Sequence, residues 1–208
     1  MIIIITFLKT PLYIMSLVKI NNSYPKDRRL TRGMTDKNVA HSYLPLYDTL
    51  LEPIKNTATN IFELGVNRGG SIRLWHEYFT KATIYACDII DNVQIPELKT
   101  NDRICLYLND DAYTETFIQE KFKNKKFDFL LDDGPHTLES QEKFIELYSP
   151  LLSENGILII EDIPKINWLE NLKDITPPEL KQYIKTYDLR KKKRRWDDIV
   201  FTIDRVVR

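Results

Sequence analysis

Short apolar runs alternate with longer amphipathic stretches along most of this chain of 208 residues. Five runs are brief, rich in β-branched or aromatic residues and closed by turn residues, which predicts buried strands. They cover residues 61–64, 82–88, 103–108, 127–132 and 157–160. Between them, apolar positions recur at helical spacing, as at Phe144, Leu147, Tyr148 and Leu151. Strands that alternate with helices predict an α/β domain with a parallel sheet.

Two further strand patterns close the chain, at residues 183–189 and 199–203, and predict a terminal hairpin. The regular pattern begins near Thr35, so we assign residues 35–208 to a single domain and residues 1–34 to an N-terminal extension. The apolar start of the extension has no basic region and no cleavage site, and Met15 offers an alternative translation start.

The composition narrows the range of partners. Thirty basic and thirty acidic residues give a formal net charge of zero, so no overall field favours nucleic acid or an anionic membrane. The apolar start, residues 1–8, is too short to span a bilayer. The two cysteines, Cys87 and Cys105, lie in apolar runs without metal-type or redox-type spacing, which favours a reduced, cytoplasmic environment.

A glycine-rich stretch follows the first predicted strand and opens a helix. It contains three glycines and a serine, namely Gly65, Gly69, Gly70 and Ser71. The glycines allow a tight turn close to a ligand, and Ser71 is placed to cap the helix. Glu63 adds a carboxylate at the strand end, which suits the ammonium and sulfonium of S-adenosylmethionine better than a dinucleotide pyrophosphate. An ordinary strand-to-helix turn explains the stretch equally well when it is taken alone.

Acidic residues also follow the second and third predicted strands. Asp88 lies about twenty residues beyond the glycine turn, where a carboxylate can accept hydrogen bonds from both hydroxyls of a ribose. A turn-initiating aspartate is the alternative. Asp110 and Asp111 come after the third strand, where either could accept the exocyclic amine of adenine. A helix-capping role explains at least one of them without any ligand.

A second acidic group follows the fourth and fifth predicted strands, and consists of Asp132, Asp133, Glu161 and Asp162, with His136 nearby. Neighbouring parallel strands lie about 5 Å apart, so Asp133, Glu161 and Asp162 can reach one ion. Oxygen ligands without cysteine favour a hard cation, with Mg²⁺ first. Two separate pairs of turn-capping acids are the alternative.

Residues 190–195 are all lysine or arginine, and Trp196 follows them. A basic tip of a hairpin is usually a solvated face. The alternative is a contribution to binding an anionic nucleotide-sugar.

These elements together resemble the class I S-adenosylmethionine-dependent methyltransferases. That family has a Rossmann-like α/β fold with a seven-stranded, mostly parallel sheet and an antiparallel last strand. The chain more closely resembles the magnesium-dependent sugar O-methyltransferases of the macrocin, mycinamicin and rhamnosyl types. The resemblance covers most of residues 35–162, and it rests on Thr35-Asp36-Lys37 with His41 and Tyr43, Glu63 to Ser71 with Trp75, Asp132 to His136, and Gly156 to Asp162.

The resemblance implies a metal-assisted O-methyltransferase that acts on a hydroxyl of a nucleotide-sugar or other glycoside. Glu63 and the glycine turn would hold the methionine part of the cofactor, and Asp88 its ribose; we add Asp110 and Asp132 to the cofactor site. The metal would be bound by Asp133, Glu161 and Asp162, and His136 would be the base. Pro135 stands where such proteins usually carry serine.

Two other functions stay open. The acceptor could be a catechol-like small molecule, since the same metal chemistry applies to any vicinal diol. The chain could also be a noncatalytic module that binds S-adenosylmethionine. As partners we expect a small-molecule or glycan sugar acceptor and a homo-oligomer, and neither nucleic acid nor a membrane.

Overall fold

The computed structural model describes residues 15–24 and 35–208. Its centre is a seven-stranded sheet in the order β3-β2-β1-β4-β5-β7-β6. The strands are β1 (Asn60–Leu64), β2 (Thr83–Asp88), β3 (Ile104–Leu108), β4 (Phe127–Asp132), β5 (Leu152–Ile160), β6 (Ile184–Asp188) and β7 (Ile199–Asp204). The first five strands are parallel, and β7 runs antiparallel to both β5 and β6. The predicted α/β fold with an antiparallel last strand is confirmed.

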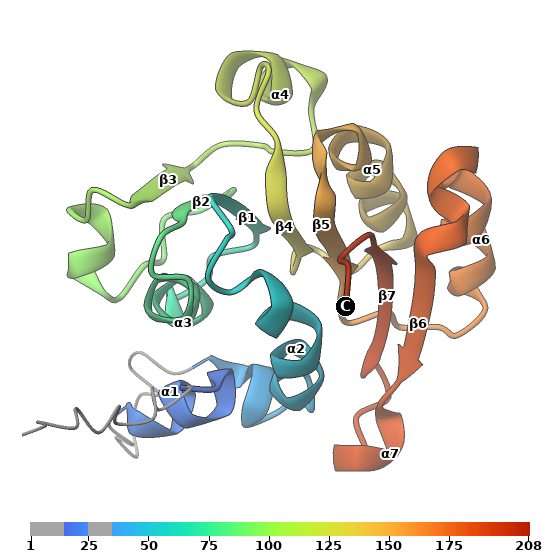
Figure 1. Ribbon diagram of the computed structural model, residues 1–208, viewed down its shortest axis with the longest axis horizontal. Helices are drawn as coiled ribbons and strands as arrows, with labels where there is room; N and C mark the ends of the chain where they lie inside the picture. The colour runs from blue at the N-terminus through green and yellow to red at the C-terminus, as the bar shows by residue number, and fades with distance from the viewer. Residues whose placement is uncertain (1–14, 25–34) are drawn as a thin grey trace, which may run out of the picture.

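Helices cover both faces of the sheet (Figure 1). One face carries α1 (Leu17–Ser23), α2 (Leu44–Leu51) and α3 (Gly70–Tyr78), and the other carries α4 (Glu115–Lys121), α5 (Leu138–Tyr148) and α6 (Trp168–Ile175). The shorter helical segments are η1 (Asp36–Asn38), η2 (Glu52–Ile54), η3 (Pro96–Lys99), η4 (Ser149–Leu151), η5 (Pro178–Tyr183) and α7 (Arg190–Lys193).

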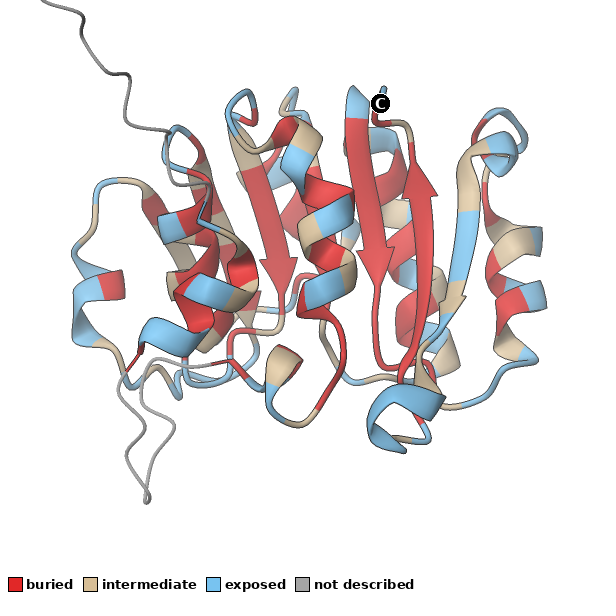
Figure 2. Ribbon diagram, turned by 60° about the horizontal axis from the view of Figure 1, so that its bottom comes forward, coloured by how far each residue is buried: buried red, intermediate tan, exposed pale blue. Residues whose placement is uncertain are grey.

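The core consists of two clusters, one on each face of the sheet, because successive side chains of a strand point to opposite faces. On β1, Ile61 packs in the cluster under α3, whereas Phe62 packs in the cluster under α5. Figure 2 shows the central strands buried along their length and the edge strand β6 partly exposed. This alternation also decides where the acids at the strand ends point.

Two features differ from the sequence pattern or extend it. β5 begins at Leu152 rather than at Ile157, and its pairing with β4 shifts register between Phe127 and Phe129. Part of the predicted extension belongs to the core, because Leu17 is buried and its backbone N–H donates to Asp48 Oδ1 at 2.6 Å. Residues 1–14 and 25–34 lie outside the described residues. Within the described residues, none of the helices combines the length and apolar character needed to cross a bilayer.

Candidate active site

Two adjoining cavities lie at the carboxyl edge of the parallel strands. The larger, of about 490 Å³, is bounded by the glycine turn, η1 and the loops after β4 and β5. The smaller, of about 270 Å³, lies between the loops after β2, β3 and β4. Both are lined by Gly65, Asp88, Asp133 and Gly134. An open α/β sheet binds its ligands at this edge, so these cavities form the candidate active site.

The glycine turn needs its glycines for conformation and for space. Gly65 has φ = +96°, and a Cβ atom there would lie 2.0 Å from the carbonyl oxygen of Asp133. The backbone of β1 can therefore approach the loop after β4 only without a side chain. Gly69, with φ = +91°, is the N-cap residue of α3. The predicted helix cap at Ser71 is wrong, since Ser71 lies in the first turn of α3 and lines the larger cavity.

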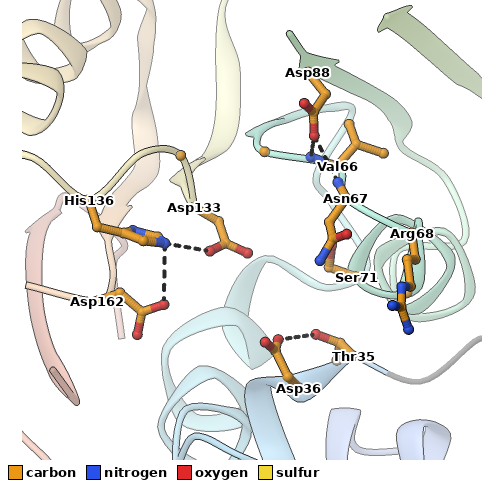
Figure 3. Close-up of a pocket in the computed structure, with 13 residues that line it drawn as sticks. Thr35, Asp36, Val66, Asn67, Arg68, Ser71, Asp88, Asp133, His136 and Asp162 are labelled. Carbon is orange, nitrogen blue, oxygen red and sulfur yellow. Dashed lines mark hydrogen bonds and ion pairs between the residues drawn. The ribbon is translucent and has the colours of Figure 1, made fainter. Parts of the chain in front are cut away.

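Asp88 lies at the junction of the two cavities and orders the glycine turn. Its Oδ2 accepts hydrogen bonds from the backbone N–H groups of Val66 and Asn67, at 2.9 and 2.8 Å (Figure 3). Its Oδ1 accepts from the N–H of Ile90 at 3.1 Å. The carboxylate thus fixes the turn that forms the wall between the cavities.

Glu63 lies beneath the cavities and does not line them. It points to the same face of the sheet as Ile61, where Trp75 Nε1 donates to its Oε2 at 2.6 Å. Its Oε1 lies 3.5 Å from Lys37 Nζ. Burial raises the pKa of the Glu63 carboxyl to about 7, although the Lys37 ammonium opposes that shift.

Lys37 carries a buried ammonium among three acids from three strand ends. Its Nζ donates to Asp133 Oδ2 at 2.5 Å and to Glu161 Oε1, and it lies near Glu63. Burial by itself lowers the pKa of Lys37, but the acids raise it well above its ordinary value. The second oxygen of Glu161 accepts from Tyr47 Oη. This positive charge is a feature that the sequence analysis did not assign.

Asp133, Asp162 and His136 meet on one side of the larger cavity (Figure 3). His136 Nε2 lies 3.8 Å from Asp133 Oδ1 and 3.7 Å from Asp162 Oδ2. His136 and Asp162 both have left-handed backbones, with φ of +56° and +53°. This conformation is uncommon outside glycine, and such residues cluster at functional sites. Because of its left-handed backbone, the side chain of Asp162 points in a different direction from that of Glu161.

A buried polar network supports Asp162 from behind. Tyr43 Oη donates to Asp162 Oδ1 at 2.5 Å. His41 Nδ1 lies 3.1 Å from the same oxygen and 2.8 Å from Asp198 Oδ1. Arg195 Nη2 approaches the other ring nitrogen of His41 at 3.5 Å. Together these contacts fix one oxygen of Asp162 and leave Oδ2 facing His136.

The smaller cavity has a less polar wall. Ile89, Ala112 and Tyr113 line it, together with the carboxylates of Asp110 and Asp111. Asp132 lies behind this wall, where its Oδ1 accepts from Tyr113 Oη at 2.5 Å. Burial raises the pKa of Asp132 to about 7.

The structure brings together some of the predicted site residues and separates others. Gly65, Ser71, Asp88, Asp133, His136 and Asp162 line the larger cavity, and Asp110 lines the smaller. Glu63, Gly69, Asp132 and Glu161 line neither. Within the described residues, two groups of side chains could each hold a metal ion, because one ligand atom from every member lies within 4.8 Å of the others. The first group is Asp133, His136 and Asp162, and the second is His41, Asp162, Asp197 and Asp198.

In the sequence, Lys37, His41 and Tyr43 stood out only as part of the family resemblance, and Asp198 did not stand out at all. The first three could not be found from spacing, since each reaches its partners over a long separation. Lys37 and Asp133, for example, are 96 positions apart. The one available signal was the Thr35-Asp36-Lys37 stretch with His41 and Tyr43 in the family resemblance.

A family model described as a methyltransferase domain matches residues 62–163, which run from β1 to the loop after β5. This part of the chain is a methyltransferase domain.

The methyltransferase domain has several relatives of known function. The chain is 29% identical to mycinamicin VI 2″-O-methyltransferase of Micromonospora griseorubida, over 62% of this chain and 33% of that protein. It is 28% identical to the 8-demethyl-8-(2-methoxy-alpha-L-rhamnosyl)-tetracenomycin-C 3′-O-methyltransferase of Streptomyces olivaceus, over 71% of this chain and 39% of that protein. The chain spans between a third and two fifths of the length of these relatives.

Solved structures share the fold of the domain. The MycE methyltransferase of the mycinamycin pathway, in complex with Mg, SAH and mycinamycin VI, aligns with a TM-score of 0.66 at 18% identity, over 92% of this chain and 53% of that one. The fibrillarin pre-rRNA processing protein of Methanococcus jannaschii aligns with a TM-score of 0.53 at 18% identity, over 71% of this chain and 66% of that one. One fold thus serves proteins with very different roles, so the acceptor must be argued from the site.

Proposed function

We propose that this chain is an S-adenosylmethionine-dependent, magnesium-assisted O-methyltransferase that acts on a hydroxyl of a sugar. The observation that carries the proposal is the meeting of the two cavities at Asp133, beside His136 and Asp162. A cofactor that spans both cavities would present its reactive methyl group where acids and a base converge.

The smaller cavity suits the adenosine part of the cofactor. Its apolar residues, Ile89 and Ala112, can enclose an adenine ring, and Asp110 offers an acceptor for the exocyclic amine. Asp88 stands at the junction, where the ribose would lie. In the larger cavity, Arg68 and the first turn of α3 with Ser71 can receive the methionine carboxylate.

Three of the proposed cofactor residues would act indirectly. Glu63, Gly69 and Asp132 do not line the cavities, but each holds an element that does. Glu63 links β1 to α3 through Trp75, and Gly69 starts α3. Asp132 holds the loop after β4 through the N–H of Gly134 at 3.3 Å.

The acids after β4 and β5 fit a hard divalent cation. We propose Asp133, Glu161 and Asp162 as its ligands, since all three offer oxygen. The Lys37 ammonium bridges Asp133 and Glu161 and marks the region as one where a positive charge is stable. Glu161 would have to exchange part of its contact with Lys37 or Tyr47 for the ion.

The residues of the chain then divide the work of methyl transfer. The proposed ligands Asp133, Glu161 and Asp162 would hold Mg²⁺, which would supply a Lewis acid that lowers the pKa of a sugar hydroxyl; S-adenosylmethionine would supply the methyl group and leave as S-adenosylhomocysteine. His136 Nε2 accepts the proton of that hydroxyl, and the flanking carboxylates of Asp133 and Asp162 stabilise the resulting imidazolium. Tyr43 and His41 keep Asp162 in place during the transfer.

The lining of the larger cavity favours a sugar over a catechol. Besides the glycines and Val66, it is formed by polar or charged side chains, which are Thr35, Asp36, Asn67, Arg68, Ser71, Asp88, Asp133, His136 and Asp162. An aromatic acceptor needs an apolar slot, whereas a sugar needs many hydrogen-bonding groups. The names of the relatives support the same choice, because one of them is an O-methyltransferase of a rhamnosyl tetracenomycin and another is an O-methyltransferase of mycinamicin VI.

Other features of the proposed setting follow from the same evidence. We place the reaction in the cytoplasm, since Cys87 and Cys105 are both free thiols. We expect neither nucleic acid nor a membrane as a partner, and we keep a homo-oligomer as an expectation.

Ligand binding followed by product analysis tests the proposal. S-adenosylmethionine should raise the unfolding midpoint of the purified protein, Mg²⁺ should strengthen that effect, and a chelator should remove the increment. His136→Ala should keep cofactor binding but lose turnover by about 10²-fold or more. His76→Ala should change neither, because His76 lies on α3 and lines neither of the two active-site cavities. Unchanged turnover in His136→Ala would remove the histidine from the reaction, and no stabilisation by saturating cofactor would refute the proposal.

A further inference from the structure

The connection between β6 and β7 places a strongly basic surface at the active-site edge of the sheet. We call residues Arg190–Trp196 the basic segment. Since β6 and β5 both pair antiparallel with β7, they run in the same direction, and the connection lies beyond their carboxyl ends. Figures 1 and 2 show α7, which begins the segment, projecting beyond this edge of the sheet.

The basic segment is attached to the active site at two points. Lys193 Nζ donates to the carbonyl oxygens of Asn38 and Val39, which lie two and three positions after Asp36 of the larger cavity. Arg195 Nη2 lies 3.2 Å from Asp197 Oδ2 and 3.5 Å from His41 Nε2. Since His41 also contacts Asp162, Arg195 is connected to Asp162 through one intervening side chain. These contacts distinguish the segment from a hairpin tip that extends freely into solvent.

Four cations of the segment line a shallow cavity of about 400 Å³. Its lining contains Arg190, Lys191, Arg194, Arg195, Trp196 and a single acid, Asp188. Arg190 pairs with Asp188 at 2.7 Å. In the part of the chain that the structure describes, Lys191 and Arg194 have no carboxylate within ion-pair distance. Within the described residues, Lys191 and Arg194 therefore leave an excess of positive charge beside this cavity, which indicates an anionic ligand.

Trp196 adds a second kind of recognition to the same cavity. The residue is 63% exposed beside the cations, although large aromatic residues are normally covered. An exposed indole can stack on a flat ring, while guanidinium groups bind phosphate oxygens in pairs. A nucleoside diphosphate offers both partners, an aromatic base and two adjacent phosphates.

We infer that the basic segment binds the nucleoside diphosphate group of a nucleoside-diphosphate-linked sugar, whose sugar enters the larger cavity. This inference rests on the proposed sugar methylation and names its acceptor class. Lys191, Arg194 and Arg190 contact the phosphates, and Trp196 stacks on the base. A lipid-linked sugar diphosphate has the same phosphate chemistry but no base, so the two sources can be separated by experiment.

Calorimetric titration with uridine diphosphate, inorganic pyrophosphate and uridine tests the binding directly. Uridine diphosphate should bind more tightly than uridine, and rising salt should weaken it. Lys191→Glu should weaken it by about tenfold or more, because a contact to a charged phosphate is lost and repulsion replaces it. The matched control is Lys123→Glu, an exposed lysine before β4 at the opposite edge of the sheet, and it should stay within about twofold.

Trp196→Ala should weaken binding of uridine diphosphate and leave pyrophosphate unchanged. Equal loss of affinity in Lys191→Glu and Lys123→Glu would overturn the site. Equal binding of pyrophosphate and uridine diphosphate, unaffected by Trp196→Ala, would overturn the nucleoside assignment in favour of a lipid-linked diphosphate. Tighter binding of a single-stranded RNA than of uridine diphosphate would overturn the acceptor assignment altogether.

The affinity for S-adenosylmethionine, measured on the same variants, reports separately on the proposed function. Lys191→Glu should leave it unchanged, because Lys191 lines neither of the two main cavities. With a uridine-diphosphate-linked sugar as acceptor, Lys191→Glu should raise KM for the acceptor and keep kcat within about twofold. Loss of kcat without a change in KM would overturn the assignment, even if methylation itself were established.

Discussion

Replacement of Lys37 by methionine tests the charge balance at the centre of the site. The substitution keeps an unbranched apolar side chain that is one atom shorter, and it removes the ammonium. That ammonium lies 2.5 Å from Asp133 Oδ2 and 3.5 Å from Glu63 Oε1, and it also contacts Glu161. Without it, three buried or half-buried carboxyl groups lose their shared counter-charge.

The expected loss of stability follows from these distances. At an effective dielectric constant of about 20, the attraction between the ammonium and the Asp133 carboxylate at 2.5 Å amounts to roughly 7 kcal/mol before desolvation is counted. The cost of burying the charges offsets most of this, so removal of one partner typically destabilises by about 3–5 kcal/mol. In a chain of this size, that loss corresponds to a fall in unfolding midpoint of roughly 6–20 °C.

Denaturant and thermal unfolding at neutral pH, with chelator present, measure the effect. The matched control is Lys99→Met, because Lys99 Nζ also lies 2.5 Å from a carboxylate, Asp91 Oδ2. That pair is 42% and 37% exposed, so solvent screens it and the midpoint should hardly change. If Lys37→Met is no less stable than Lys99→Met, the argument from the buried ammonium is refuted.

Magnesium supplies a second readout on the same variant. If Asp133 and Glu161 bind the ion as proposed, Mg²⁺ should stabilise Lys37→Met by more than it stabilises the unmodified protein. The reason is that the ion replaces a charge that the variant lacks. An equal shift in both proteins would mean that the ammonium and the metal do not share ligands.

Three other perturbations give sharp outcomes. Burial raises the pKa of Glu63 to about 7, so the free energy of unfolding should fall as pH rises from about 4.5 to 7. Glu63→Gln should lessen that fall in equilibrium unfolding, and an unchanged dependence on pH contradicts the shift in pKa. Gly65→Ala should lower the free energy of unfolding by more than about 2 kcal/mol and abolish cofactor binding, because its Cβ would meet the Asp133 carbonyl. Near-normal cofactor binding in calorimetry contradicts this steric argument. Tyr43→Phe should lower kcat with cofactor affinity retained; a changed affinity alone would argue against support of Asp162.

The order of strands and helices could be read from the sequence because it depends on local patterns. Apolar runs bounded by turns predicted β1 to β4 with bounds close to those observed, and the final hairpin was predicted as well. Residues that end parallel strands must meet at one edge of a sheet, so the general location of the site was also predictable. The glycine turn was identified for the same reason, since the left-handed conformation of Gly65 is a local requirement.

The direction of each acidic side chain was decided by the tertiary structure. Asp132 and Asp133 are neighbours in the sequence, yet the strand alternation sends Asp132 toward Tyr113 and Asp133 toward Lys37. Glu161 continues the alternation of β5 toward Lys37, whereas the left-handed backbone turns Asp162 toward Tyr43 and His136. The pattern of adjacent acids therefore predicted that the acids would cluster, but not which acid would face which partner.

By itself, the sequence determined the elements, the edge of the sheet where the site lies and the residue types found there. Only the tertiary structure decided which groups balance one another, because those partners lie far apart along the chain. The ammonium of Lys37 reaches Glu161 over 124 positions, and His41 reaches Asp198 over 157. Such contacts exist only once the sheet has brought its strand ends together, so they cannot be predicted from the local preferences of the chain.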